Sequence, residues 1–185
     1  MRLPALLLVL LAAGCSGSPD VVQHVPAAAG GPDGPAGAVT LSGSGEFAAG
    51  NTAAIAYDRR LAPNGAQASL KAESTGGTTR TSLVVEGFVP NRRYGAHLHT
   101  GACAADPEAS GPHYQHHPGQ VTPSSEVWLD FKTDASGAGR ATARHEWALD
   151  PAALPKSLVI HAQPTKKKGE QAGTAGPRIA CLTLS

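Results

Sequence analysis

The chain has 185 residues, of which 41% are hydrophobic and only 4% aromatic, and its 15 Lys and Arg residues nearly balance 14 Asp and Glu residues. This length predicts one folded domain with a substantial core, and the flat charge balance argues against a nucleic-acid-binding protein. The 22 Gly and 15 Pro residues disfavour a helical bundle and are typical of short strands joined by many turns. No apolar run reaches the roughly 18 residues that a membrane-spanning helix needs.

The N-terminus has the pattern of an export signal. A positively charged start precedes an apolar stretch over residues 3–13. The small residues before Cys15 resemble a bacterial lipobox, in which the cysteine is lipidated and becomes the mature N-terminus, although Leu11 lies one position further from the cysteine than that pattern prefers. We therefore expect residues 1–14 to be a lipoprotein signal peptide. The alternative is a plain secretory signal, with Cys15 as an incidental thiol.

The segment after the signal has no hydrophobic periodicity. Residues 15–40 consist largely of Gly, Pro and Ala, which predicts a flexible tether. Acyl chains on Cys15 would anchor the protein to a bacterial cell membrane, on its periplasmic or outer surface, where the compartment is oxidising. Residues 41–185 are expected to form the folded domain.

That domain alternates short β-type runs with turn clusters, which predicts an all-β fold. Eight strands are expected, and they suggest an antiparallel Greek-key β-barrel. They cover residues 52–58, 66–74, 79–86, 94–100, 126–133, 140–147, 156–161 and 178–184. Two connections, residues 101–125 and 162–177, are too long for hairpin turns, and long loops on a β scaffold often carry function.

Histidines are concentrated near these loops. His97 and His99 are two residues apart in a predicted strand, so their side chains share one face, about 6.6 Å apart along the backbone. His113 follows in the first long loop, and His161 ends an apolar strand. Four imidazoles favour copper or zinc over magnesium or calcium, and composition does not choose between the two. His145, between charged neighbours, is expected on the surface.

Several motifs together resemble the copper/zinc superoxide dismutase family. They are YGAHLH followed by Gly101 and Cys103, then SGPH, then VIH, then AGPRIAC, in the family's order and at compatible spacing. The resemblance covers about residues 79–185. It implies a superoxide dismutase fold with the copper ligands His97, His99, His113 and His161. It further implies a disulfide between Cys103 and Cys181 and an active-site arginine at Arg178.

The zinc-binding part of the family pattern is altered in this chain. Trp128 stands about where the family has an aspartate ligand, and His116 and His117 lie too close to His113 to replace the missing histidines easily. We therefore expect a copper-only site, with zinc doubtful. An improvised second metal site that uses Glu126 or Asp130 is the alternative.

The resemblance implies a copper-dependent superoxide dismutase, with superoxide as substrate. Arg178 would dock the anion and His113 would deliver a proton. Residues 166–168 are three lysines, which could attract superoxide electrostatically or be a solvated loop tip. A non-catalytic, lipid-anchored protein that sequesters or transfers copper is the alternative function. The sequence does not indicate the oligomeric state.

Overall fold

The computed structural model describes residues 37–50 and 53–185. Over these ranges the chain forms nine strands, all paired antiparallel, and one short 3-10 helix, η1 (Pro107–Ser110). The strands are β1 (Val39–Glu46), β2 (Ala54–Ala56), β3 (Gln67–Thr75), β4 (Thr78–Glu86), β5 (Arg93–His99), β6 (Phe131–Lys132), β7 (Gly139–His145), β8 (Ser157–His161) and β9 (Arg178–Thr183).

The prediction of an antiparallel all-β fold is confirmed, but eight strands were predicted where nine are found. The additional strand is β1, which begins at Val39, two residues before the expected start of the domain. The predicted signal peptide, the tether up to residue 36 and the lipidation site Cys15 lie outside the described residues. No helix in the described part of the chain is long and apolar enough to cross a membrane.

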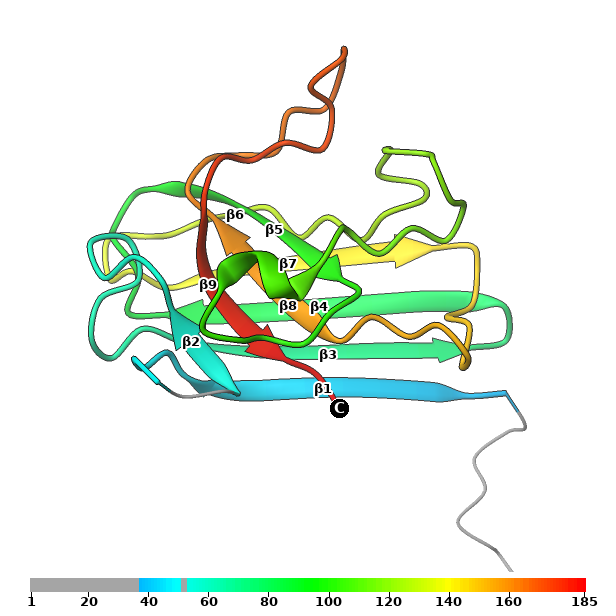
Figure 1. Cartoon of the computed structure of the whole chain (residues 1–185), viewed down its shortest axis with the longest axis horizontal. Helices are drawn as coiled ribbons and strands as arrows, with labels where there is room; N and C mark the ends of the chain where they lie inside the picture. The colour runs from blue at the N-terminus through cyan, green and yellow to red at the C-terminus, as the bar shows by residue number, and fades with distance from the viewer. Residues whose placement is uncertain (1–36, 51–52) are drawn as a thin grey trace, which may run out of the picture. The chain divides into compact units, whose positions relative to one another are not determined.

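The first sheet contains β1, β3, β4 and β7 in this spatial order, and its long strands run across the view in Figure 1. β3 and β4 alternate between exposed and buried residues, as expected for strands with one face on a core and the other in water. The backbone of Ser42 in β1 exchanges two hydrogen bonds with Ser185, of 2.8 and 2.9 Å. These bonds join an edge of the first sheet to the chain end that follows β9.

The second sheet has the order β2-β9-β8-β5-β6 and is buried more deeply. All residues of β8 and all but the first of β5 are buried, because the long connections pack on this sheet. Residues 126–133, predicted as one strand, are mostly irregular: isolated bridges at Glu126 and Trp128 precede the two-residue strand β6. Figure 1 shows residues 162–177 and the loop before β6 projecting from the same side of the domain.

An aromatic cluster joins the two sheets in the core. The ring of Phe88, which follows β4, makes edge-to-face contacts with Phe47, Tyr94 and Phe131 at centroid distances of 5.8, 5.4 and 5.8 Å. Such aromatic pairs are worth about 0.5–1.5 kcal/mol each beyond the area that they bury. The cluster lies between the layers and so fixes β5, which carries two of the candidate metal ligands.

Candidate metal centre

Strand pairing brings the four predicted ligands together. β5 carries His97 and His99, and in the neighbouring strand β8 His161 lies opposite Gly95. The chain after η1 pairs with β5 through a bridge between His99 and His113. Each of the four histidines offers one nitrogen, and these atoms lie within 4.8 Å of one another. No other such group of three or more His, Cys, Asp or Glu residues occurs in the part of the chain that the structure describes.

The inward-facing nitrogens of three of these rings have no hydrogen-bond partner. They are buried and belong to Nδ1 of His97, Nε2 of His99 and Nε2 of His161. The opposite nitrogens of His99 and His161 are 2.9 and 3.0 Å from the carbonyl oxygens of Gly111 and Gly176. A carbonyl oxygen only accepts, so each ring donates from Nδ1 and keeps a lone pair on Nε2. Buried lone pairs without partners are costly, and a metal ion satisfies them, so this donor set fits copper or zinc.

Burial keeps these imidazoles neutral at neutral pH. It lowers the pKa of His99 to about 3 and that of His161 to about 4, against the opposing effect of the hydrogen bonds to Gly111 and Gly176. The pKa of fully buried His97 is lowered well below its usual value, first by burial and then by the neighbouring histidines. Neutral imidazole is the form that binds a metal, so the site is ready for an ion without first releasing protons.

The fourth histidine is held by a buried carboxylate. His113 donates from Nδ1 to Oε2 of Glu126 at 2.7 Å, and Glu126 is 1% exposed. The same carboxylate accepts hydrogen bonds from Gln115 at 2.8 Å and from the indole of Trp128 at 2.6 Å. Burial alone would raise the pKa of Glu126, but the three donated hydrogen bonds hold that pKa below its usual value. His113 is therefore fixed with its Nε2 free.

The predicted arginine lies beside the cluster. Arg178 donates from Nη1 to the Pro107 carbonyl and to Ser110 Oγ, and from Nη2 to the Gly111 carbonyl. Its Nη2 also lies 3.2 Å from a carboxylate oxygen of the exposed side chain of Glu108. The Gly111 carbonyl thus accepts from both Arg178 and His99. The Arg178 charge contributes to the lowered pKa values of His99 and His161.

The predicted disulfide is confirmed, since Cys103 and Cys181 are bonded across a sequence separation of 78 residues. It ties the loop that contains η1 to β9, the strand on which Arg178 lies. The amide of Cys103 also donates to Thr183 Oγ1 at 3.3 Å. Arg178 and its carbonyl partners are therefore held on two covalently linked segments.

The other three histidines of the described residues lie apart from this group. His116 stacks on Trp147 with ring centroids 4.5 Å apart, and its ring is 4.5 Å from that of His117. The expectation of a surface position for His145 was wrong: it is 6% exposed, and its Nε2 lies 3.1 and 3.0 Å from the carbonyl oxygens of Pro123 and Glu126. The ring of His145 thus fastens the loop that carries Glu126 to β7.

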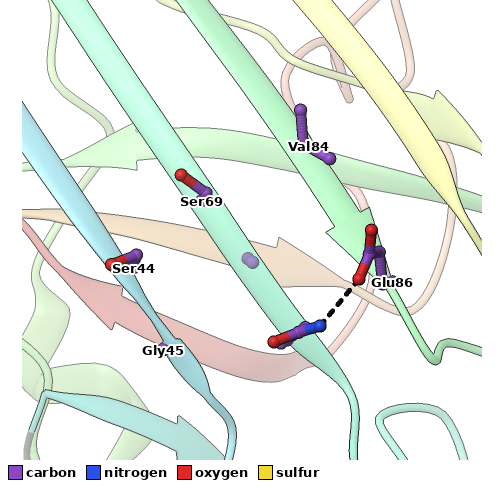
Figure 2. A pocket seen from close by; sticks show the side chains of 7 residues that line it. Ser44, Gly45, Ser69, Val84 and Glu86 are labelled. Atoms are coloured by element: carbon purple, nitrogen blue, oxygen red, sulfur yellow. Dashed lines mark hydrogen bonds between the residues drawn. The ribbon is translucent and has the colours of Figure 1, made fainter.

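A solvent-open hollow lies against the histidine cluster. It is lined by His113, His161 and Glu126 and by residues of both long loops, among them Val121 and Gly173. A second hollow, on the outer face of the first sheet, is lined by small residues, Val84 and Glu86 (Figure 2). Its polar contact is a hydrogen bond of 2.7 Å from Gln67 to Glu86, and no potential metal ligand other than this carboxylate lines it. The chemistry therefore belongs to the first hollow.

The sequence did not indicate which residues hydrogen-bond to the histidine nitrogens that face away from the cluster. Glu126 was considered as a metal ligand, whereas it binds His113 through hydrogen bonds. Asp130, the other residue considered, contacts Thr165: its Oδ2 accepts from the Thr165 amide at 2.8 Å and its Oδ1 from the Thr165 hydroxyl at 2.5 Å. The Thr165 hydroxyl lies 2.6 Å from Nε2 of His97. A threonine in a loop gives no sequence signal for this role.

Comparison with known proteins gives one family and one fold. The sequence profile of the family described as copper/zinc superoxide dismutase (SODC) matches residues 65–183, which include the four clustered histidines, the disulfide and Arg178. Among solved structures, the chain is similar to the Cu/Zn superoxide dismutase from Brucella abortus, with a TM-score of 0.54 and 19% identity over 80% of this chain and 99% of that one. At this identity the likeness supports the fold alone. No curated protein sequence matches the chain.

Proposed function

The chain belongs to the copper/zinc superoxide dismutase family, and on this premise we propose that it is a copper-dependent superoxide dismutase that converts two superoxide ions and two protons to oxygen and hydrogen peroxide. The observation that carries the proposal is the convergence of three buried, partnerless imidazole nitrogens with His113. Arg178 beside them favours catalysis over copper storage, because storage needs no cation to dock an anion.

In this proposal His97, His99 and His161 hold copper, which supplies one-electron chemistry when bound. His113 is suited to proton delivery, because Glu126 fixes its Nδ1 while Nε2 faces the other ligands. The side chain of His113 is 18% exposed and lines the open hollow, so water can return a proton to it. Arg178 would attract superoxide and hold it by charge-assisted hydrogen bonds.

We propose that the site works without zinc. Zinc in this family would need Nδ1 of His113, and the Glu126 carboxylate takes that position in the hydrogen-bond network. A carboxylate acceptor fixes the ring and raises its basicity, as outer partners of metal-bound histidines generally do. Glu126 thus supports His113 in the way that a second metal would.

Rapid mixing of superoxide with copper-loaded protein tests the activity. We expect turnover well above that of the same concentration of free copper, and turnover no faster than free copper would leave the sequestration or transfer function as the better one. Arg178→Ala should slow turnover and leave copper bound. Arg140→Ala is the matched control, because Arg140 is an exposed arginine of β7. Equal rates for the two variants would remove the docking role.

Elemental analysis after growth with both metals tests the copper-only site. We expect one copper and no stoichiometric zinc per chain. Glu126→Ala should weaken copper binding by about 10–100-fold, the usual effect of removing an outer partner of a metal ligand. One zinc per wild-type chain would contradict this part of the proposal.

We further propose that Cys15 is lipidated and holds the domain at a bacterial cell membrane. The lipobox-like sequence before Cys15 supports this, and the disulfide is consistent with an oxidising compartment. Labelling cells with a tagged fatty acid should mark the wild-type protein and leave Cys15→Ala unmarked. If both proteins are labelled, the acyl chain is attached elsewhere. If neither is labelled, no acyl chain is attached.

A further inference from the structure

His97 differs from the other three histidines in the hydrogen-bond partner of its outer nitrogen, the ring nitrogen that faces away from the proposed metal position. The outer nitrogens of the other three histidines face acceptors only, two carbonyl oxygens and a carboxylate. Nε2 of His97 faces the hydroxyl of Thr165 at 2.6 Å, and a hydroxyl either donates or accepts. If it donated, the ring proton would lie on Nδ1, the nitrogen aimed at the metal position, and would block binding there.

Asp130 removes this ambiguity. Its Oδ1 lies 2.5 Å from the Thr165 hydroxyl, and an ionised carboxylate only accepts, so the hydroxyl proton points to Asp130. The Thr165 oxygen must then accept from His97, which places the ring proton on Nε2. We propose that Asp130 and Thr165 form a hydrogen-bond relay that selects the tautomer of His97 and keeps its Nδ1 open for the metal. This inference rests on the proposed copper site.

The surrounding backbone holds the relay in place. Asp130 Oδ2 accepts from the Thr165 amide at 2.8 Å, so both carboxylate oxygens bind one residue. Gly95 lets the loop approach β5, because a Cβ there would lie 2.7 Å from the Gln163 carbonyl and 3.1 Å from the Thr165 hydroxyl. Thr165 is 6% exposed and His97 is fully buried. Water therefore does not compete for the contact between them.

The test is the tautomer of His97, read from ¹H–¹⁵N spectra of the metal-free protein. We expect the Nε2–H form in the wild type. In Asp130→Asn the amide nitrogen can donate to the Thr165 oxygen while its carbonyl keeps the Thr165 amide, so the hydroxyl turns toward His97. We expect the Nδ1–H form in this variant, and Cu(II) affinity, measured by competition with a chelator, lower by about 10–100-fold. Asp150→Asn, an exposed aspartate in a turn, is the matched control and should change neither.

A second pair of variants keeps the proposal testable if Asp130→Asn does not fold. Thr165→Val removes the hydroxyl and should weaken Cu(II) binding, whereas Thr165→Ser should restore it because the hydroxyl returns. Thr78→Val is the control, since this exposed hydroxyl of β4 donates to the backbone carbonyl of Thr75 and does not line the hollow.

The outcomes separate the relay from the activity. An Nε2–H ring and unchanged Cu(II) affinity in Asp130→Asn would overturn the relay, as would failure of Thr165→Ser to rescue Thr165→Val. The proposed function fails separately, if the copper-loaded wild type does not turn over superoxide. The tautomer measurement needs neither copper nor turnover.

Discussion

Loss of the Cys103–Cys181 disulfide is expected to lower the melting temperature of the domain substantially. The bond closes a loop of 78 residues, and loop-closure entropy in the unfolded chain makes such a bond worth about 4 kcal/mol. For a domain of this size each kcal/mol shifts Tm by about 2–4 °C, so the expected fall is roughly 8–16 °C. Cys181 is fully buried and Cys103 is 8% exposed, so reduction should be slow in the folded state and complete only after partial opening.

Thermal unfolding followed by circular dichroism, with and without reductant, measures this effect. The double variant Cys103→Ala/Cys181→Ala should melt at the lower temperature in both buffers, and the wild type should approach it only when reduced. A difference within about 3 °C, which corresponds to roughly 1 kcal/mol, would refute the entropy argument for this loop.

Three further predictions concern single side chains. Burial lowers the pKa of His145, so the unfolded chain takes up the proton at a higher pH than the folded chain. The free energy of unfolding should therefore fall as the pH drops below about 6.5, and it should fall less steeply in His145→Gln. Urea titrations that give the same pH dependence for both proteins would contradict this prediction. Gly173 has φ of 81°, and a Cβ there would lie 2.4 Å from Val121. Gly173→Ala should therefore lower Tm, and Val121→Ala added to it should recover part of that loss. If the two losses in Tm simply add, the steric contact is excluded. Arg178 is proposed to dock the anion, and the Glu108 carboxylate, 3.2 Å from its Nη2, would compete for that position. Glu108→Gln should therefore raise kcat/KM at low salt by about 2–5-fold, the range of an exposed ion pair. No difference from Glu170→Gln would remove this role.

The strand pattern was predictable wherever apolar residues alternate with polar ones. This holds for β3, β4 and β7. β5, β8 and β9 are almost continuously buried and were predicted from short apolar runs between turn residues, and only two residues of the predicted segment 126–133 form a strand, β6. β1 was missed because its sequence, VTLSGSGE, places only Leu41 as a large side chain in the core. It is a strand because its backbone pairs with β3 over eight residues and with Ser185, and pairing partners distant in sequence leave no local signal.

The histidine cluster was predicted from motifs, and the structure places those four side chains together. The motifs did not indicate which groups accept hydrogen bonds from the imidazole rings. Two of these acceptors are the backbone carbonyls of Gly111 and Gly176. Both glycines have positive φ, 71° and 73°, and lie in the SGPH and AGPRIAC motifs, but a motif does not show where a backbone carbonyl points. Thr165 and Asp130 are 35 residues apart, and only the packing of the second long loop on β5 brings them into contact.

These outer contacts divide the ligands into two kinds. Backbone carbonyls fix the tautomers of His99 and His161, so side-chain substitution cannot remove those acceptors without moving the chain. His97 and His113 depend on side chains, through Asp130 and Glu126 respectively. Both carboxylates come from the irregular segment between the first long loop and β6. The two carboxylates are four residues apart and serve different histidines, Glu126 directly and Asp130 through Thr165. Trp128, which stands about where the family resemblance places a zinc aspartate, lies between them in sequence and donates to Glu126.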